Sequence, residues 1–143
     1  MVIGQFIANV TKSRRVAVPK KFRKDLGDRY VIAKWYEKCL ILVSKNDWQK
    51  LMARLTGDTR ALTSPVRDTD RFLMASAYET RCDGQGRIVL PKYLSDYARI
   101  TTEALFLGLG NRVEIWDKKE WEKRELYIAT HASGMLESIA KDA

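Results

Sequence analysis

A short segment near the start of the chain carries seven basic side chains and no acidic one. The basic residues between positions 11 and 24 are Lys12, Arg14, Arg15, Lys20, Lys21, Arg23 and Lys24. Lysine and arginine neutralise phosphates, and arginine can also form paired hydrogen bonds to the edge of a guanine base. The segment could therefore bind a polyanion such as nucleic acid, or it could be an ordinary solvated basic face.

The positive charge of the chain is concentrated in its first half, although charge alone favours an ordinary solvated face over a polyanion partner. The 143 residues include 26 lysines and arginines against 18 acidic residues, a net charge of +8. Residues 1–70 hold 15 basic and 7 acidic residues, which gives +8, whereas residues 71–143 hold 11 of each, which gives zero. All of the excess positive charge therefore lies in the first half, and a localised excess is typical of proteins that bind nucleic acid.

Few other residues could support catalysis or bind a metal. His131 is the only histidine, and the two cysteines, Cys39 and Cys82, do not form a CxxC pair. No glycine-rich phosphate loop and no hydrolase motif is present. We therefore expect no enzymatic activity, no cofactor, no metal and no small-molecule substrate. No apolar run approaches the length of a membrane span, so we expect a cytoplasmic protein with two partly buried free thiols.

The basic segment overlaps the first copy of an internal repeat. Arg15 to Lys20 reads Arg-Val-Ala-Val-Pro-Lys, and Arg87 to Lys92, at a spacing of 72 residues, reads Arg-Ile-Val-Leu-Pro-Lys. Each copy predicts a short strand and then a helix that begins at the proline. The order strand, turn, strand, helix, strand, strand, helix occurs in both halves. Because each half is too small to bury a secure core alone, we expect the halves to interlock around a pseudo-twofold axis.

The predicted elements divide the chain into four segments. They are a first repeat over 1–57, a linker with a short helix over 58–75, a second repeat over 76–121 and a helical tail over 122–143. The short helix is predicted over Asp68–Met74, and Gly134 marks a candidate break in the tail. Three arrangements of the tail stay open: packing on its own core, contact with a neighbouring subunit, and fraying.

The two copies differ in the turn that precedes the shared strand. The second turn, Asp83-Gly84-Gln85-Gly86, has glycines that allow positive φ and a carboxylate that can pair with Arg87. The first turn, Thr11-Lys12-Ser13-Arg14, has threonine in place of the aspartate and arginine in place of the second glycine. Since residues other than glycine rarely take positive φ, we expect the first turn to have a different shape. The second turn is predicted to provide stability, and the first to expose positive charge.

The pattern Asp-x-x-x-Arg, apolar strand, proline and helix, followed by Glu-Ile-Trp, resembles the MraZ family. The stretches that carry this resemblance are 83–91 and Val113–Trp116, with support from Pro19–Arg23, Gly27–Tyr30 and Cys39–Leu40. It extends from about Gly4 to Trp121. The resemblance implies a mainly β protein with helices (β+α), in which two AbrB-like swapped-hairpin repeats form one pseudo-twofold, β-barrel-like core with flanking helices.

The resemblance also implies a function. MraZ-like proteins form rings of subunits and bind repeated DNA boxes upstream of the bacterial division and cell-wall (dcw) gene cluster, where they regulate transcription. The implied partners of this chain are therefore double-stranded DNA and further copies of itself, in the cytoplasm at the nucleoid. The family's DNA contacts centre on the first turn, which corresponds here to Lys12, Arg14 and Arg15.

Residue types suggest how the contacts are divided. Lys20, Lys21, Arg23 and Lys24 are expected to contact phosphates, and Arg14 and Arg15 are candidates for base edges. For Asp83 and Arg87 both a structural ion pair and a DNA contact are possible, and we favour the ion pair. One alternative function is a ring-forming scaffold that binds acidic proteins or RNA. A second is an antitoxin-like protein whose tail clamps a toxin, against which the modest acidity of the tail argues.

Overall fold

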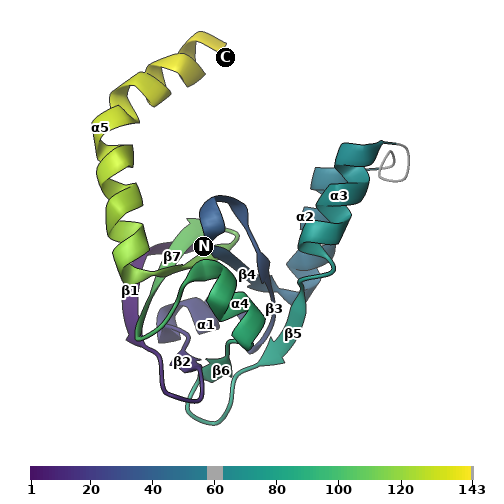
Figure 1. The fold of residues 1–143 in the computed structure, drawn as a ribbon, viewed down its shortest axis with the longest axis vertical. Helices are drawn as coiled ribbons and strands as arrows, with labels where there is room; N and C mark the ends of the chain where they lie inside the picture. The colour runs from purple at the N-terminus through teal and green to yellow at the C-terminus, as the bar shows by residue number, and fades with distance from the viewer. Residues whose placement is uncertain (58–62, 143) are drawn as a thin grey trace.

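The computed structural model describes residues 1–57 and 63–142 and combines antiparallel strands with helices (Figure 1). The strands are β1 (Val2–Asn9), β2 (Arg15–Ala17), β3 (Arg29–Lys34), β4 (Leu40–Ser44), β5 (Tyr78–Arg81), β6 (Arg87–Val89), β7 (Glu103–Gly110) and β8 (Val113–Asp117). The helices are α1 (Lys20–Leu26), α2 (Lys45–Thr56), α3 (Ser64–Leu73), α4 (Lys92–Ala98) and α5 (Lys118–Asp142), with a 3-10 turn, η1 (Tyr36–Lys38). The predicted mainly β class with helices is confirmed.

The two halves of the chain share both of its sheets. The six-stranded sheet has the order β1-β7-β8-β4-β3-β5, and β2 pairs with β6 in a separate ribbon. This order is unchanged when β1 is exchanged with β5, β3 with β7 and β4 with β8. The outer strands cross between halves, because β1 pairs with β7 and β5 pairs with β3. The predicted interlocking about a pseudo-twofold axis is confirmed, while the described strands do not close into a barrel.

Two equivalent backbone hydrogen bonds show which residues of the first half correspond to which residues of the second half. The Val10 N–H donates to the Thr102 carbonyl at 2.8 Å, and the Cys82 N–H donates to the Asp28 carbonyl at 2.9 Å. Both bonds lie where an outer strand enters its hairpin turn. Residues 9 and 81 are therefore equivalent, as are residues 103 and 29, because these residues pair next to the two bonds.

Apolar side chains fill both faces of the large sheet. On one face, α1, α4 and the β2–β6 ribbon enclose a core that includes Phe22, Ile88 and Leu94, all almost fully buried. On the other face, α2, α3 and the first turns of α5 cover a second core that includes Trp116 and Trp121. Burial of both faces explains why the strand sequences are so apolar.

Local capping determines where α2, at the end of the first repeat, and α3, in the linker, begin. Ser44 caps α2 because its Oγ accepts a hydrogen bond of 3.2 Å from the Asp47 N–H. Helix α3 begins four residues before the predicted Asp68, since Thr63 caps it and Pro65 occupies its first turn. Of the predicted 58–75 linker, residues 58–62 lie outside the described residues.

The tail forms one helix and does not break at Gly134. Helix α5 extends away from the body of the molecule in Figure 1. The apolar side chains of Leu126, Leu136 and Ile139, each about two-thirds exposed, lie on this projecting part. In the structure, therefore, only the first turns of the tail pack on the protein's own core, and the rest of the helix does not.

Candidate nucleic-acid interface

The first turn, residues 11–14, is closed by backbone hydrogen bonds. The Thr11 N–H donates to the Arg15 carbonyl, and the Arg14 N–H donates to the Thr11 carbonyl, both at 2.9 Å. The Thr11 hydroxyl oxygen also accepts a bond of 3.0 Å from the Arg15 N–H. Arg14 has a φ of 62°, in the left-handed region.

The second turn, residues 83–86, has the same bonding scheme. The Asp83 N–H donates to the Arg87 carbonyl at 2.8 Å, and the Gly86 N–H donates to the Asp83 carbonyl at 3.0 Å. One Asp83 carboxylate oxygen accepts from the Arg87 N–H at 3.0 Å, and Gly86 has a φ of 75°. The prediction of a different shape for the first turn is therefore wrong, because threonine supplies an equivalent acceptor and arginine adopts the conformation of glycine.

The left-handed conformation of Arg14 costs any residue other than glycine about 1–2 kcal/mol. Two hydrogen bonds across the β2–β6 ribbon hold Arg14 in it. The Leu90 N–H donates to the Arg14 carbonyl at 2.8 Å, and the Arg14 Nε donates to the Leu90 carbonyl at 3.2 Å. The first bond has an equivalent from Val18 to Gly86 at 3.0 Å, whereas the second depends on the arginine side chain. Arg14 is thus anchored by Nε while its side chain stays exposed.

The equivalent arginines Arg15 and Arg87 have different partners. The Arg87 Nε lies 3.1 Å from a carboxylate oxygen of Asp83, which confirms the predicted ion pair. The Arg15 guanidinium instead donates to the hydroxyl of Ser13 at 2.9 Å. No acidic side chain in residues 1–57 or 63–142 forms an ion pair with Arg15, so its charge stays uncompensated.

The environment of Asp83 keeps its carboxylate ionised. The Arg87 backbone N–H, supported by the Gln85 N–H and the Arg87 guanidinium, lowers the pKa of Asp83 below its usual 3.8. The carboxylate therefore neutralises the positive charge of Arg87, which directly follows the second turn. Thr11 places no such charge in the first turn.

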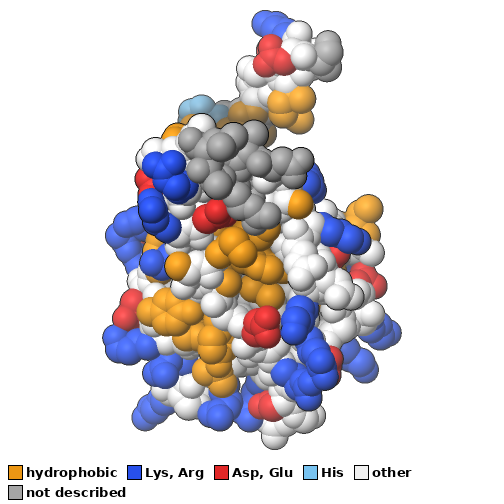
Figure 2. All heavy atoms as spheres, turned by 90° about the vertical axis from the view of Figure 1, so that its right-hand side faces the viewer, with side chains coloured by type: hydrophobic (Ala, Val, Ile, Leu, Met, Phe, Trp, Pro, Cys, Tyr) orange, Lys and Arg blue, Asp and Glu red, His pale blue; other side chains and the backbone are white. Residues whose placement is uncertain are grey.

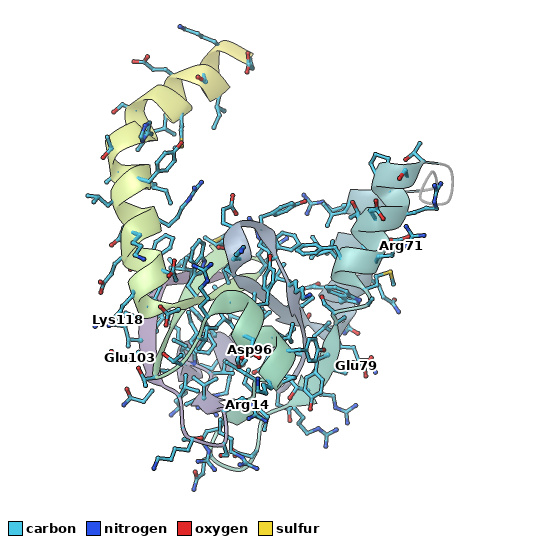
Figure 3. All side chains as sticks on the ribbon, in the orientation of Figure 1. Arg14, Arg71, Glu79, Asp96, Glu103 and Lys118 are labelled. Carbon is cyan, nitrogen blue, oxygen red and sulfur yellow. The ribbon has the colours of Figure 1, made fainter. Side chains whose placement is uncertain are left out.

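The other residues of the basic segment fall into two groups. Lys12, Lys20, Lys21 and Lys24 are exposed. Arg23 is half-buried, and its guanidinium lies against Gly86: a Cβ added to this glycine would be 2.4 Å from Arg23 Nη1. Figure 3 places Arg14 at the lower end of the molecule, beside the two turns, and Figure 2 shows lysine and arginine side chains around this end.

The structure brings together two further basic residues near the second turn. Arg29 in β3 and Arg81 in β5 are directly opposite each other and exposed. Their proximity depends on a strand pairing between the two halves, which no local pattern reveals. The repeat register could have drawn attention to Arg81, because the equivalent residue in the first copy is the uncharged Asn9.

The described residues contain no group of histidine, cysteine, aspartate and glutamate that could hold a metal ion. Burial raises the pKa of the Cys39 thiol, and Cys82, half-buried, lies 3.6 Å from the Tyr30 hydroxyl. Among the described helices, none is long and apolar enough to cross a membrane.

Comparison with known proteins identifies the family. The transcriptional regulator MraZ of Thermoanaerobacter pseudethanolicus is 40% identical over 124 residues, which cover 86% of this chain and 85% of the relative. The chain belongs to the MraZ family. The MraZ of Desulforamulus reducens is 37% identical over 141 residues, and that of Natranaerobius thermophilus is 34% identical over 142, with at least 96% of each chain covered.

A family model described as "MraZ protein, putative antitoxin-like" also matches residues 73–137. This match contains the whole second turn with its aspartate and glycines. The alignments with the Desulforamulus reducens and Natranaerobius thermophilus proteins extend the similarity over both repeats. The predicted family resemblance is confirmed.

Proposed function

We propose that this MraZ protein is a sequence-specific transcriptional regulator that binds repeated DNA boxes upstream of the dcw gene cluster. The observation that carries the proposal is the contrast between Arg15 and Arg87. Both follow turns with the same backbone bonds, but only Arg87 is neutralised by a carboxylate. An exposed turn with uncompensated arginine is suited to the negatively charged grooves of DNA.

The first turn and α1 would contact different parts of the DNA. Lys12 and Arg14 lie on the turn, Arg15 directly follows it, and these side chains would approach base edges. The exposed lysines of α1 would contact flanking phosphates and set the register of the protein on the duplex. Arg23 would contribute a phosphate contact from its position against Gly86. Asp83 and Arg87 would serve the stability of the second turn.

We further propose that several subunits assemble into a ring in the cytoplasm, at the nucleoid. One turn offers few contacts, so useful affinity requires several linked subunits that engage repeated boxes at the same time. The exposed apolar side chains of Leu126, Leu136 and Ile139 support self-association, because soluble proteins seldom leave such residues grouped in solvent. The names of the relatives support regulation of transcription.

A binding titration with the DNA upstream of the protein's own gene tests the proposal. Arg15→Ala should weaken binding by roughly 10- to 100-fold, which corresponds to about 1–3 kcal/mol for a base contact. Arg87→Ala is the matched control at the equivalent position and should have a much smaller effect. Circular dichroism should show that both variants keep the native helix content.

Scrambled DNA and RNA of the same length complete the experiment. Equal affinity of the unaltered protein for the box and for the scrambled sequence would contradict sequence recognition. Stronger binding to RNA would favour the alternative of a scaffold that binds RNA through its basic segment.

A further inference from the structure

Two arginines face each other at the outer edge of the large sheet. Arg29 and Arg81 are directly opposite in the β3–β5 pair, so their side chains emerge on the same face. Cβ atoms of such pairs lie about 5 Å apart, and like charges in this arrangement are destabilising. Neither guanidinium forms an ion pair with any residue of 1–57 or 63–142. The described residues therefore place no carboxylate within ion-pair distance of either guanidinium.

The surroundings of this pair are rich in positive charge. Arg29, Arg81 and Lys45 border a cavity of about 260 Å³ together with Glu79. Glu79 is engaged by Lys45, whose Nζ lies 3.6 Å from its carboxylate. Asp28 borders the neighbouring cavity but makes no ion pair with Arg29. The start of α2 also borders both cavities, and the positive end of a helix dipole favours an anion.

The pseudo-twofold axis supplies an internal comparison. At the equivalent site, Asn9 pairs with Glu103 in β1–β7. Lys118, the first residue of α5, lies 3.8 Å from the carboxylate of Glu103. Figure 3 shows Lys118 and Glu103 close together, on the side of the molecule away from Glu79. The same strand pairing thus forms without opposed arginines, so the fold does not explain Arg29 and Arg81.

We propose that Arg29 and Arg81 bind a phosphate group of the DNA backbone. The inference rests on the proposed function and adds a second anchor point to it. Arg81 precedes Asp83 by two residues, so the site lies at the base of the second turn. The forked donors of two guanidinium groups match the oxygens of one phosphate. The second repeat would thereby hold the duplex while the first turn reads its bases.

The salt dependence of DNA binding tests this site. The variant carries Arg29→Gln and Arg81→Gln together, and its affinity is measured for the box and for scrambled DNA at several salt concentrations. Loss of one phosphate contact should reduce the slope of log K against log salt by about 0.9. The affinity should fall by the same factor for both DNA sequences. Lys118→Gln, at the equivalent site, should leave the slope unchanged.

The outcomes separate this inference from the proposed function. An unchanged slope in the double variant overturns the phosphate site even if the unaltered protein selects its box. A loss confined to the box sequence also overturns it, because that result indicates base contacts. If inorganic phosphate raises the unfolding temperature of the unaltered protein but not that of the double variant, while the slope for DNA stays the same, the site binds free phosphate and the DNA claim fails. If the unaltered protein does not select its box but the double variant has a reduced slope, the proposed function is contradicted and the phosphate site is supported.

Discussion

At the scale of single residues, threonine and aspartate perform the same structural task with different charge. The Thr11 hydroxyl and the Asp83 carboxylate each accept a bond of 3.0 Å from the backbone N–H four residues later. Only the carboxylate also attracts the guanidinium of that residue. One substitution in the repeat therefore preserves the turn and frees Arg15 for another partner.

This difference predicts a different response of the two turns to acid. The pKa of Asp83 is lowered in the folded protein, so its stabilising effect is fully present above the usual value of 3.8 and is lost as pH falls through the lower folded value. Backbone amide signals of Gln85 and Arg87 should therefore shift in an NMR titration only below about pH 4. The Arg15 amide should not follow, because Thr11 does not titrate. A titration of Asp83 above its usual pKa would contradict the bonds described for this turn.

Residue chemistry could be predicted only where partners are close in the sequence. The Asp83–Arg87 pair is visible because both residues belong to one turn. The conformation of Arg14 was not predicted, because the bonds that hold it come from Leu90 in the other repeat. The opposition of Arg29 and Arg81 likewise depends on pairing between the halves.

At the scale of elements, the pairing of β1 with β7 depends on a close backbone approach at Gly108. Gly108 lies opposite Gly4 in this pair. A Cβ added to Gly108 would lie 2.6 Å from the Ile3 nitrogen and 2.7 Å from the Val2 carbonyl carbon. These are backbone atoms of an edge strand, which cannot yield without loss of ladder hydrogen bonds.

Gly108→Ala should therefore destabilise the protein. Overpacking of this kind typically costs about 1–3 kcal/mol, so thermal unfolding followed by circular dichroism should show a midpoint several degrees lower. Gly134→Ala is the matched control, because nothing lies within 4 Å of its added Cβ. Alanine is favoured over glycine in a helix, so this control should be neutral or slightly stabilising. Equal midpoints for the two variants would show that β1 tolerates displacement from β7.

Element types and their order could be predicted from periodicity, capping residues and the repeat itself. The predicted start of α3 at Asp68 is four residues too late, because Pro65, which interrupts a helix elsewhere, suits the first turn of one. The position of α5 relative to the rest of the molecule could not be predicted. Its sequence is amphipathic, but a sequence pattern does not show whether another element packs against the apolar side of a helix.

At the scale of the whole molecule, the two halves have the same architecture but different surroundings. Helix α2 is covered by α3, whereas its equivalent α5 projects into solvent beyond its first turns (Figure 1). Hydrophobic side chains also gather on the face that carries β5 (Figure 2), where Phe72, Met74, Tyr78 and Tyr93 are exposed. Two different apolar regions on opposite sides of one subunit suit head-to-tail contacts, which close into rings when the rotation between subunits permits.

This asymmetry predicts which substitutions would dissociate the proposed assembly. Leu136→Lys combined with Ile139→Lys adds two positive charges to the exposed apolar side of α5, where burial against another subunit would leave them unpaired. Native mass spectrometry should then show smaller species than the unaltered protein forms. Glu137→Lys changes the net charge by the same +2 on an exposed polar position and should leave the assembly intact.

DNA with one box and DNA with several boxes should distinguish assembly from recognition in these variants. If linked subunits provide the affinity, the double α5 variant should lose most of its preference for repeated boxes while it binds a single box as before. Its first turn is unchanged and lies at the opposite end of the molecule from the altered residues. A variant that keeps both its mass and its preference for repeated boxes would show that α5 does not form the subunit contact.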